Sequence, residues 1–327
     1  MNKEKRTVET TPRPVAAPSP VQPQAVFNVA LADGTTQDLA AFGLDELQRL
    51  QWQQEQAFAR RILDAPKGST ARIEAVRQAY DTVSAILAAR RGVCSEPLVM
   101  SGEDHRHVGL VVGLLAEAAR GGREPRFFEI GLGSGTLMKN VRDAGFPVAG
   151  IEVSAELHAR ACQLLGEEHR GDLLRGDFLR QGFSAQQRYS LIYWNAVFEH
   201  IPPDEIGDYL EKIYRLLSPG GQLVTLTPSW HLRPSDITAE FCPPRTEAAG
   251  LHLKEYTLRE ITGLVRQAGF ARVATPLVLT RKRFVLWGKG LIDWKRLFEP
   301  CLERLPFYLA QIVCRKLGFC CTIAAKP

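Results

Sequence analysis

The residues with the clearest chemical meaning lie in the stretch FFEIGLGSGT, which begins at residue 127. Three glycines, Gly131, Gly133 and Gly135, occupy alternate positions directly after an apolar run, and Glu129 precedes the first of them by two residues. Glycines permit a sharp turn and let the backbone approach a ligand without a Cβ in the way. In an open parallel sheet the first strand-to-helix turn is a usual ligand contact. The sequence therefore predicts a binding site at this turn.

Carboxylates that follow the first strands indicate which ligand fits. Glu129, at the end of its strand, repels a phosphate but holds a cationic amino group. Glu152 closes the next strand, where a carboxylate can chelate a ribose diol. Asp177 follows the third strand region in GDF, although Asp172 nearby leaves the register of that strand ambiguous. The glycine spacing also departs from the dinucleotide fingerprint G-x-G-x-x-G. These residues together describe a ligand with an ammonium group, a ribose and a base, but no phosphate.

The elements that must position these residues alternate along the chain. After residue 126, short β-rich runs alternate with helical stretches, which indicates βαβ units and a parallel sheet. Three helices are expected before the glycine turn, at 45–63, 71–90 and 102–119. Helices are expected after it at 136–144, 154–165, 204–217 and 257–268, and a strand at 271–279. The predicted organisation is a disordered tail at 1–25, an N-terminal helical extension at 26–122, and a domain at 123–327 with a helical insertion at 281–317.

Composition excludes several protein classes. The hydrophobic share of 45% and the charged share of 24% are those of a globular protein. Seven cysteines without a CxxC pair or zinc-finger spacing favour a reducing cytoplasm over disulfides or structural zinc. The sequence contains no run of about eighteen apolar residues, the length that a membrane-spanning helix needs. We therefore expect a cytoplasmic protein.

Several motifs together resemble those of class I S-adenosylmethionine-dependent methyltransferases. They are EIGLGSGT, Glu152, GDF, YSLIYWNAVFEHI and LLSPGGQLVTLTP, and the resemblance covers roughly residues 123–228. It implies an α/β, Rossmann-like fold with a seven-stranded sheet of order 3-2-1-4-5-7-6 and helices on both faces. The last strand, for which FCCTIAA fits, would be antiparallel. The implied cofactor is S-adenosylmethionine, and the product is S-adenosylhomocysteine.

The resemblance also implies roles for individual residues. Glu129 and the three glycines of the turn would border the methionine part of the cofactor. Glu152 would bind the ribose hydroxyls, and Asp177 with Phe178 would lie beside the adenine. Asn195, at the end of the fourth strand, completes the predicted cofactor-binding set.

The methyl acceptor is less well defined. An oxygen or nitrogen acceptor must lose a proton, which calls for a nearby base, and His200 and His231 are the candidates by location. The alternative is that the Glu-His pair at 199–200 only caps a helix or borders the adenosine. His252, Lys254 and Tyr256 either line the acceptor pocket or belong to a surface turn before a capping Thr257.

No metal site is expected, because catechol-type members of the family use several carboxylates and here only Glu199 is in place. The motifs favour a small-molecule acceptor, and lipid-linked and sugar-containing molecules remain open. The absence of an NPPY-type motif argues against methylation of adenine in nucleic acid, so no nucleic-acid partner is expected. Homo-oligomerisation is left open.

The segment 281–316 carries nine Lys or Arg against three Asp or Glu, interleaved with aromatic and aliphatic residues. A lid helix over the acceptor site is the preferred interpretation, and peripheral contact with a membrane is the alternative.

Two rival functions also remain open: an NAD-dependent oxidoreductase, and a catalytically silent methyltransferase-like binding or scaffold module.

Overall fold

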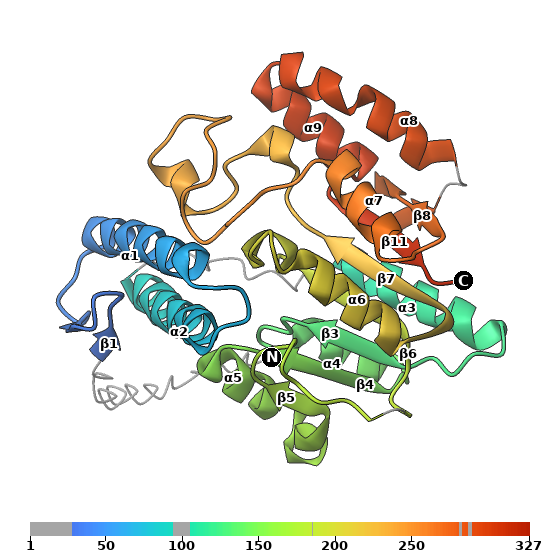
Figure 1. Cartoon of the computed structure of the whole chain (residues 1–327), viewed down its shortest axis with the longest axis horizontal. Coiled ribbons are helices and arrows are strands. Elements are labelled where there is room, and N and C mark those ends of the chain that lie inside the picture. Colours follow the sequence, from blue (N-terminus) through green and yellow to red (C-terminus); the bar gives the residue numbers. More distant parts are fainter. Residues whose placement is uncertain (1–27, 94–104, 185, 281–282, 287–289) are drawn as a thin grey trace, which may run out of the picture.

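The computed structural model describes residues 28–93, 105–184, 186–280, 283–286 and 290–327 (Figure 1). The predicted tail at 1–25 lies outside these residues. The described chain forms a twisted sheet with helices on both faces, flanked by a pair of N-terminal helices and by a late helical segment.

The central sheet of the described chain has seven strands in the order β5-β4-β3-β6-β7-β11-β8. Its neighbours are parallel except at β11, which runs antiparallel to both β7 and β8. This order confirms the expected 3-2-1-4-5-7-6 sheet, and the FCCTIAA run supplies its antiparallel strand. The strands are β3 (Phe127–Ile130), β4 (Val148–Glu152), β5 (Leu173–Arg175), β6 (Tyr189–Asn195), β7 (Leu217–Leu226), β8 (Arg272–Ala274) and β11 (Cys321–Ala325).

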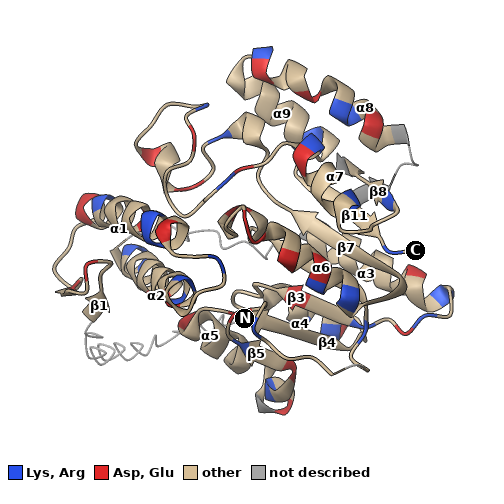
Figure 2. Ribbon diagram, in the orientation of Figure 1, with Lys and Arg blue, Asp and Glu red and all other residues tan. Residues whose placement is uncertain are grey.

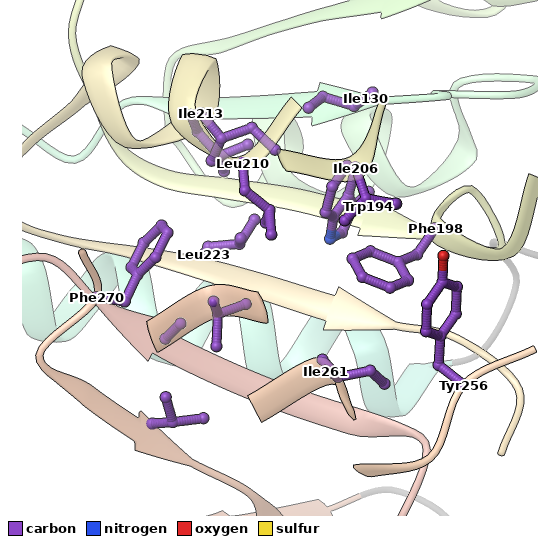
Figure 3. Close-up of a cluster of buried hydrophobic side chains, with 14 of the residues drawn as sticks. Ile130, Trp194, Phe198, Ile206, Leu210, Ile213, Leu223, Tyr256, Ile261 and Phe270 are labelled. Carbon is purple, nitrogen blue, oxygen red and sulfur yellow. The ribbon is translucent and has the colours of Figure 1, made fainter. Parts of the chain in front are cut away.

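Apolar side chains bury both faces of the sheet. One face packs against α3 (His105–Arg120), α4 (Thr136–Asp143) and α5 (Ala155–Leu165). The other packs against α6 (Ile206–Leu216) and α7 (Leu258–Gln267), and Figure 3 shows this core around Trp194, Leu210 and Ile261. The central strands β3 and β6 are therefore buried on both faces, and their side chains become available to a ligand only at the strand ends.

The N-terminal extension contains two antiparallel helices. They are α1 (Leu44–Asp64) and α2 (Thr70–Val93), preceded by a small hairpin, β1 (Asn28–Ala30) and β2 (Thr36–Asp38). The hairpin was not predicted, because its strands are only three residues long. Helix α3 falls within the predicted extension at 26–122, yet it packs on β6 and α4 as part of the sheet's own helical layer. Its apolar face, which includes Val111 and Leu115, explains this placement.

The segment before the last strand begins differently from the prediction. The expected strand at 271–279 is divided into β8, which stays in the sheet, and β9 (Pro276–Thr280), which pairs with β10 (Arg283–Leu286) in a hairpin. Helices α8 (Gly290–Phe298) and α9 (Phe307–Leu317) follow, joined by the 3-10 helix η5 (Glu299–Arg304). Other short 3-10 helices are η1 (Glu167–Asp172), η2 (Phe198–His200), η3 (Trp230–Leu232) and η4 (Ile237–Glu240).

The late helices are less basic on their surface than the sequence suggests. Lys295 is fully buried, and its Nζ donates to Thr275 Oγ1 at 2.7 Å and to the carbonyl oxygen of Pro276 at 2.8 Å. Burial lowers the pKa of this amine to about 8. Figure 2 shows residues of both signs on α8, where Asp293 pairs with Arg296. Trp294 and Leu297 are exposed beside them, and membrane contact through this segment stays a prediction.

A search of the described helices for a membrane-spanning segment finds none that is long and apolar enough.

Candidate functional site

A cavity of about 220 Å³ opens at the carboxyl ends of β3, β4, β5 and β6. The parallel register brings these four strand ends to one edge of the sheet. Six of the eight residues predicted to bind a cofactor line this cavity: Gly131, Gly133, Glu152, Asp177, Phe178 and Asn195. The structure thus brings together residues that lie up to 64 positions apart in the sequence.

The glycine turn is shaped by its neighbours. Gly131 has φ +69°, which favours glycine, and a Cβ there would collide with a methyl carbon of Val197 unless that side chain moved. The amide nitrogen of Gly133 donates to Glu152 Oε2 at 2.9 Å. Gly135 does not line the cavity, and a Cβ on it would lie 2.8 Å from Leu165 Cδ1. Its place in the motif is therefore explained by the packing of α4 against α5.

Glu152 is the last residue of β4 and is held by backbone donors on both sides. Its Oε1 accepts from the amide of Ser154 at 2.9 Å, while Oε2 accepts from Gly133. Burial raises the pKa of this carboxyl, and the hydrogen bonds from the two amides oppose that shift. Each oxygen keeps a further lone pair. A carboxylate fixed in this way is prepared to accept two hydroxyl groups from a ligand in the cavity.

Glu129 lies outside the described lining of the cavity. It is buried on the opposite pleat of β3, next to Tyr193 on β6, and its Oε2 has no hydrogen-bond partner among the described residues. Burial raises the pKa of Glu129 well above its ordinary value, and the charge of Glu152 adds to this. Glu129 therefore does not reach the cavity in this structure, and its contact with an amino group of the cofactor stays a prediction.

Asp177, rather than Asp172, follows β5 into the cavity. Asp172 precedes β5, at the other edge of the sheet, and its side chain is 53% exposed. Asp177 Oδ1 accepts from the amide of Arg180 at 3.0 Å. Phe178 stacks on Tyr209 of α6, with ring centroids 5.6 Å apart and an interplanar angle of 27°. The structure thus resolves the ambiguous register and places a carboxylate and two aromatic rings together.

Helix α2 forms a wall of the cavity that sequence reasoning missed. Arg72, Val76 and Tyr80 of α2 line the cavity. Their spacing of four residues puts them on one face of a helix, and this was the available signal. Arg72 is held by Asp204 Oδ1 at 2.8 Å and by Glu205 Oε1 at 3.0 Å, which ties α2 to the start of α6.

Tyr80 contributes to the electrostatics of the same wall. Burial raises the pKa of its hydroxyl, and the charges of Glu152, Glu199 and Glu55 add to the effect. Three carboxyl groups therefore lie close enough to Tyr80 to disfavour its ionised form.

His200, the first of the two predicted bases, lines the cavity. Its Nδ1–H donates to the carbonyl oxygen of Leu251 at 2.8 Å, which leaves Nε2 as an acceptor. Burial, with a contribution from the charge of His252, lowers the pKa of His200 to about 3. An efficient base has a pKa near the working pH. His200 is therefore placed to accept a hydrogen bond but is a weak proton acceptor in this structure.

The structure corrects the prediction for His231, which does not reach the cavity. It is 4% exposed, and its Nδ1 lies 3.1 Å from Glu303 Oε2. Its Nε2 lies 3.8 Å from Glu299 Oε1, so two acids of η5 surround the ring. Arg233 also binds Glu303, at 3.0 Å. His231 thus packs in a network of charged side chains with Glu299 and Glu303 of η5.

The predicted lid is also corrected. None of the described residues of 290–317 lines the cavity, because α8 and α9 pack against α7, β8, β9 and η3 at the other side of the molecule (Figure 1).

His252 and Lys254 line a second cavity, of about 550 Å³, with Trp230, Glu247 and Glu255 among its other walls. Tyr256 belongs to the core and packs on Phe198, with ring centroids 4.8 Å apart. Thr257 is the N-cap of α7, and its hydroxyl accepts from the amide of Glu260. Thr257 therefore caps a helix as the second alternative expected, whereas a role of His252 and Lys254 in an acceptor pocket stays a prediction.

Comparison with known proteins adds independent information. A family model described as a methyltransferase domain matches residues 104–275. A carboxy-S-adenosyl-L-methionine synthase from Chromohalobacter salexigens is 33% identical over 128 residues, which cover 36% of this chain and 45% of the synthase. An uncharacterized methyltransferase from Geobacillus thermodenitrificans is 33% identical over 96 residues, 29% of this chain and 43% of that protein. The chain thus spans less than half the length of these relatives.

Among solved structures, magnesium protoporphyrin IX methyltransferase from Synechocystis, with bound S-adenosylhomocysteine, matches 77% of this chain and 98% of its own. The sequence identity is 16% and the TM-score 0.45. The family model covers more than half of the chain. The order and direction of the sheet strands are those that the sequence resemblance implied. The protein belongs to the class I S-adenosylmethionine-dependent methyltransferases.

Proposed function

We propose that the protein transfers a methyl group from S-adenosylmethionine to an oxygen or nitrogen of a small-molecule acceptor. The observation that carries this proposal is the charge of the cavity. Glu152, Asp177 and Glu205 line it, while Arg72, the arginine of its described lining, is already paired with Asp204 and Glu205. Such a lining favours a sulfonium and an ammonium group and disfavours a pyrophosphate.

In the proposed arrangement each part of the cofactor has a distinct neighbour. The turn at Gly131 and Gly133 borders the methionine part, Glu152 accepts the ribose hydroxyls, and Asp177 with Phe178 borders the adenine. Asn195 lies between the cofactor and the acceptor. Glu129 and Gly135 support this arrangement from outside the lining, Glu129 through its buried carboxyl group beside the glycine turn and Gly135 through the packing of α4.

The reaction needs alignment more than elaborate acid–base chemistry. The acceptor atom forms a bond to the methyl carbon as the bond from that carbon to sulfur breaks, so that the sulfonium becomes a neutral thioether and the proton of the acceptor passes to solvent. Holding the two reactants in line is worth effective molarities of about 10⁵–10⁸ M. His200 Nε2 is available to accept a hydrogen bond from the acceptor and so to orient it.

A covered site supports a small acceptor. Tyr80 and Val76 of α2 lie over the carboxyl edge of the sheet and form part of the cavity wall. A segment of duplex or of folded protein would have to displace this helix to reach the methyl group. The rival binding module predicts an incomplete cofactor cavity, whereas acids from β4 and from the turn after β5 are both in position.

A transfer assay tests the proposal. The full chain is incubated with S-adenosylmethionine that carries a labelled methyl group, together with cell extract separated into small molecules, protein and nucleic acid. We expect label in the small-molecule fraction, and its loss when Asp177 and Glu152 are both replaced by alanine. Label confined to protein or nucleic acid would contradict the proposed acceptor class.

A further inference from the structure

We propose that Glu199, His200 and His252 form a binding site for a divalent transition-metal ion between the two cavities. One ligand atom from each of these residues lies within 4.8 Å of the others. His200 lines the cofactor cavity and His252 lines the second cavity. The sequence predicted no metal site because Glu199 lacked carboxylate partners; here the further ligands are histidines.

In each of the three ligand residues, one polar side-chain atom is already hydrogen-bonded to a neighbouring group. His200 Nδ1 donates to the carbonyl oxygen of Leu251 at 2.8 Å, and His252 Nδ1 lies 2.7 Å from Glu255 Oε1. The Oε2 atom of Glu199 accepts from Thr227 Oγ1 at 2.9 Å. Metal-binding histidines characteristically donate their second ring nitrogen to a carbonyl or carboxylate in this way. The remaining Nε2, Nε2 and Oε1 atoms are those free to bind an ion.

The free oxygen of Glu199 is a second, independent observation. Glu199 is fully buried, and its Oε1 has no hydrogen-bond partner in the described part of the chain. This oxygen lies 3.9 Å from His252 Nε2, too far for a hydrogen bond. Two ligands of one ion, each bound at about 2.1 Å, lie at most about 4.2 Å apart. The separation of 3.9 Å fits an ion between the two atoms, and a ligand atom of His200 lies within 4.8 Å of both other residues' ligand atoms.

Backbone contacts hold the three ligands in register. The short helix η2 follows β6 and presents Glu199 and His200 in succession. The loop that carries His252 runs alongside it, since the amide of Lys254 donates to the carbonyl oxygen of Glu199 at 3.2 Å. The amide of Leu251 in turn donates to Glu55 Oε2 of α1 at 3.1 Å. Three distant segments thus converge on one point, as a built site requires.

The ligand set indicates the class of ion. Two imidazoles and one carboxylate suit zinc, iron, cobalt or nickel better than magnesium or calcium, which prefer oxygen ligands. Three protein ligands leave at least one coordination position open. If the proposed methyl transfer holds, the ion would occupy the Nε2 lone pair of His200, and an acceptor hydroxyl could bind to the open position of the ion instead of to His200 and lose its proton to solvent more easily. This use rests on the proposed function, whereas the binding of the ion does not.

Metal titration of the full chain tests the site directly. The protein, prepared without a histidine tag and treated with a chelator, is titrated with Zn²⁺ by calorimetry and with Co²⁺ by visible absorption. We expect one ion per chain and cobalt bands typical of nitrogen and oxygen ligands. The variants Glu199→Gln and His252→Ala should each lower Zn²⁺ affinity at least tenfold. Glu255→Gln, which releases His252 Nδ1, should lower it by about 10–100-fold.

His169→Ala is the matched control, because His169 lies in η1, far along the chain from the three ligands, and should leave binding unchanged. Thermal melting of every variant identifies any that fails to fold, and in that case the wild-type cobalt spectrum and Glu255→Gln decide. The proposal is overturned if the wild type binds no stoichiometric ion, or if His169→Ala loses as much affinity as His252→Ala. The first result is the one expected if Glu199 and His252 form only an ion pair.

Binding of S-adenosylhomocysteine in the presence of chelator separates this inference from the proposed function. Cofactor binding without metal binding overturns the metal site alone. Metal binding without cofactor binding overturns the proposed function and leaves the metal site standing.

Discussion

Replacing Glu152 by alanine is the perturbation most closely tied to the proposed cofactor arrangement. Glu152 accepts from the amides of Gly133 and Ser154, both at 2.9 Å, and has lone pairs left for the two ribose hydroxyls. The variant therefore removes both proposed contacts to the ribose and also loosens the glycine turn. Both effects weaken cofactor binding, and neither depends on the identity of the acceptor.

The magnitude follows from the number of bonds. A hydrogen bond to a charged group contributes about 1.5–3 kcal/mol, and each 1.4 kcal/mol, approximately, is a factor of ten in Kd. The loss of one such bond thus weakens binding about tenfold or more, and the loss of both more strongly. Because burial raises the pKa of Glu152, the carboxyl group must first lose a proton at low pH, and this weakens wild-type binding there. We therefore expect more than a tenfold increase in Kd at pH 8.

Calorimetric titration with S-adenosylhomocysteine measures this change. Asp172→Ala is the matched control, since Asp172 lies at the other edge of the sheet and should leave Kd unchanged. Circular dichroism before each titration verifies that the variants are folded. An unchanged Kd in folded Glu152→Ala protein, or an equal loss in Asp172→Ala, would refute the assignment of the ribose to β4.

Three further changes test the packing and the electrostatics around the site. The pKa of Glu129 is raised well above 4.5 in the folded chain, so that folded protein retains a proton which unfolded protein releases, and stability falls as pH rises above 4.5. Glu129→Gln should therefore melt a few degrees higher than the wild type at pH 8 in the absence of ligand, with a smaller difference near pH 4.5. Lys295 has a folded pKa of about 8 against an ordinary value of 10.5. Wild-type stability, measured by urea titration, should therefore rise by about 2 kcal/mol relative to Lys295→Met between pH 8 and pH 10. Parallel stability curves for the two proteins would contradict the burial of Lys295. Arg72→Met leaves Glu205 buried without its cation and should cost about 3 kcal/mol, with faster proteolysis near residue 67; unaltered cleavage would show that this pair does not hold α2.

Much of the fold was predictable because its signals are local. The helices expected at 154–165 and 257–268 are observed as α5 and α7, and Thr257 is the N-cap that the sequence suggested. The order of the strands was available only through the family resemblance. Periodicity does not reveal which strands are neighbours, and the structure confirms the order that the resemblance implied.

The parts that sequence reasoning missed depend on contacts between distant segments. His231 was expected near the acceptor, but Glu303, 72 residues away, draws it into a different network. Lys295 was counted among the basic residues of segment 281–316 with no sign of its burial, but three buried acceptors around its amine hold it inside. Tyr80 was not considered, because nothing near it in the sequence shows that α2 covers the sheet edge. Each error has the same physical cause: the partner is chosen by tertiary packing.

The central claim is that the cavity beside Gly131 and Glu152 accepts a cationic nucleoside and rejects a pyrophosphate. Parallel calorimetric titrations of the wild-type chain with S-adenosylmethionine and with NAD test it most directly. We predict saturable binding of one S-adenosylmethionine per chain and no binding of NAD. The heat of S-adenosylmethionine binding should disappear when S-adenosylhomocysteine is already bound. Saturable binding of NAD without binding of S-adenosylmethionine would contradict it.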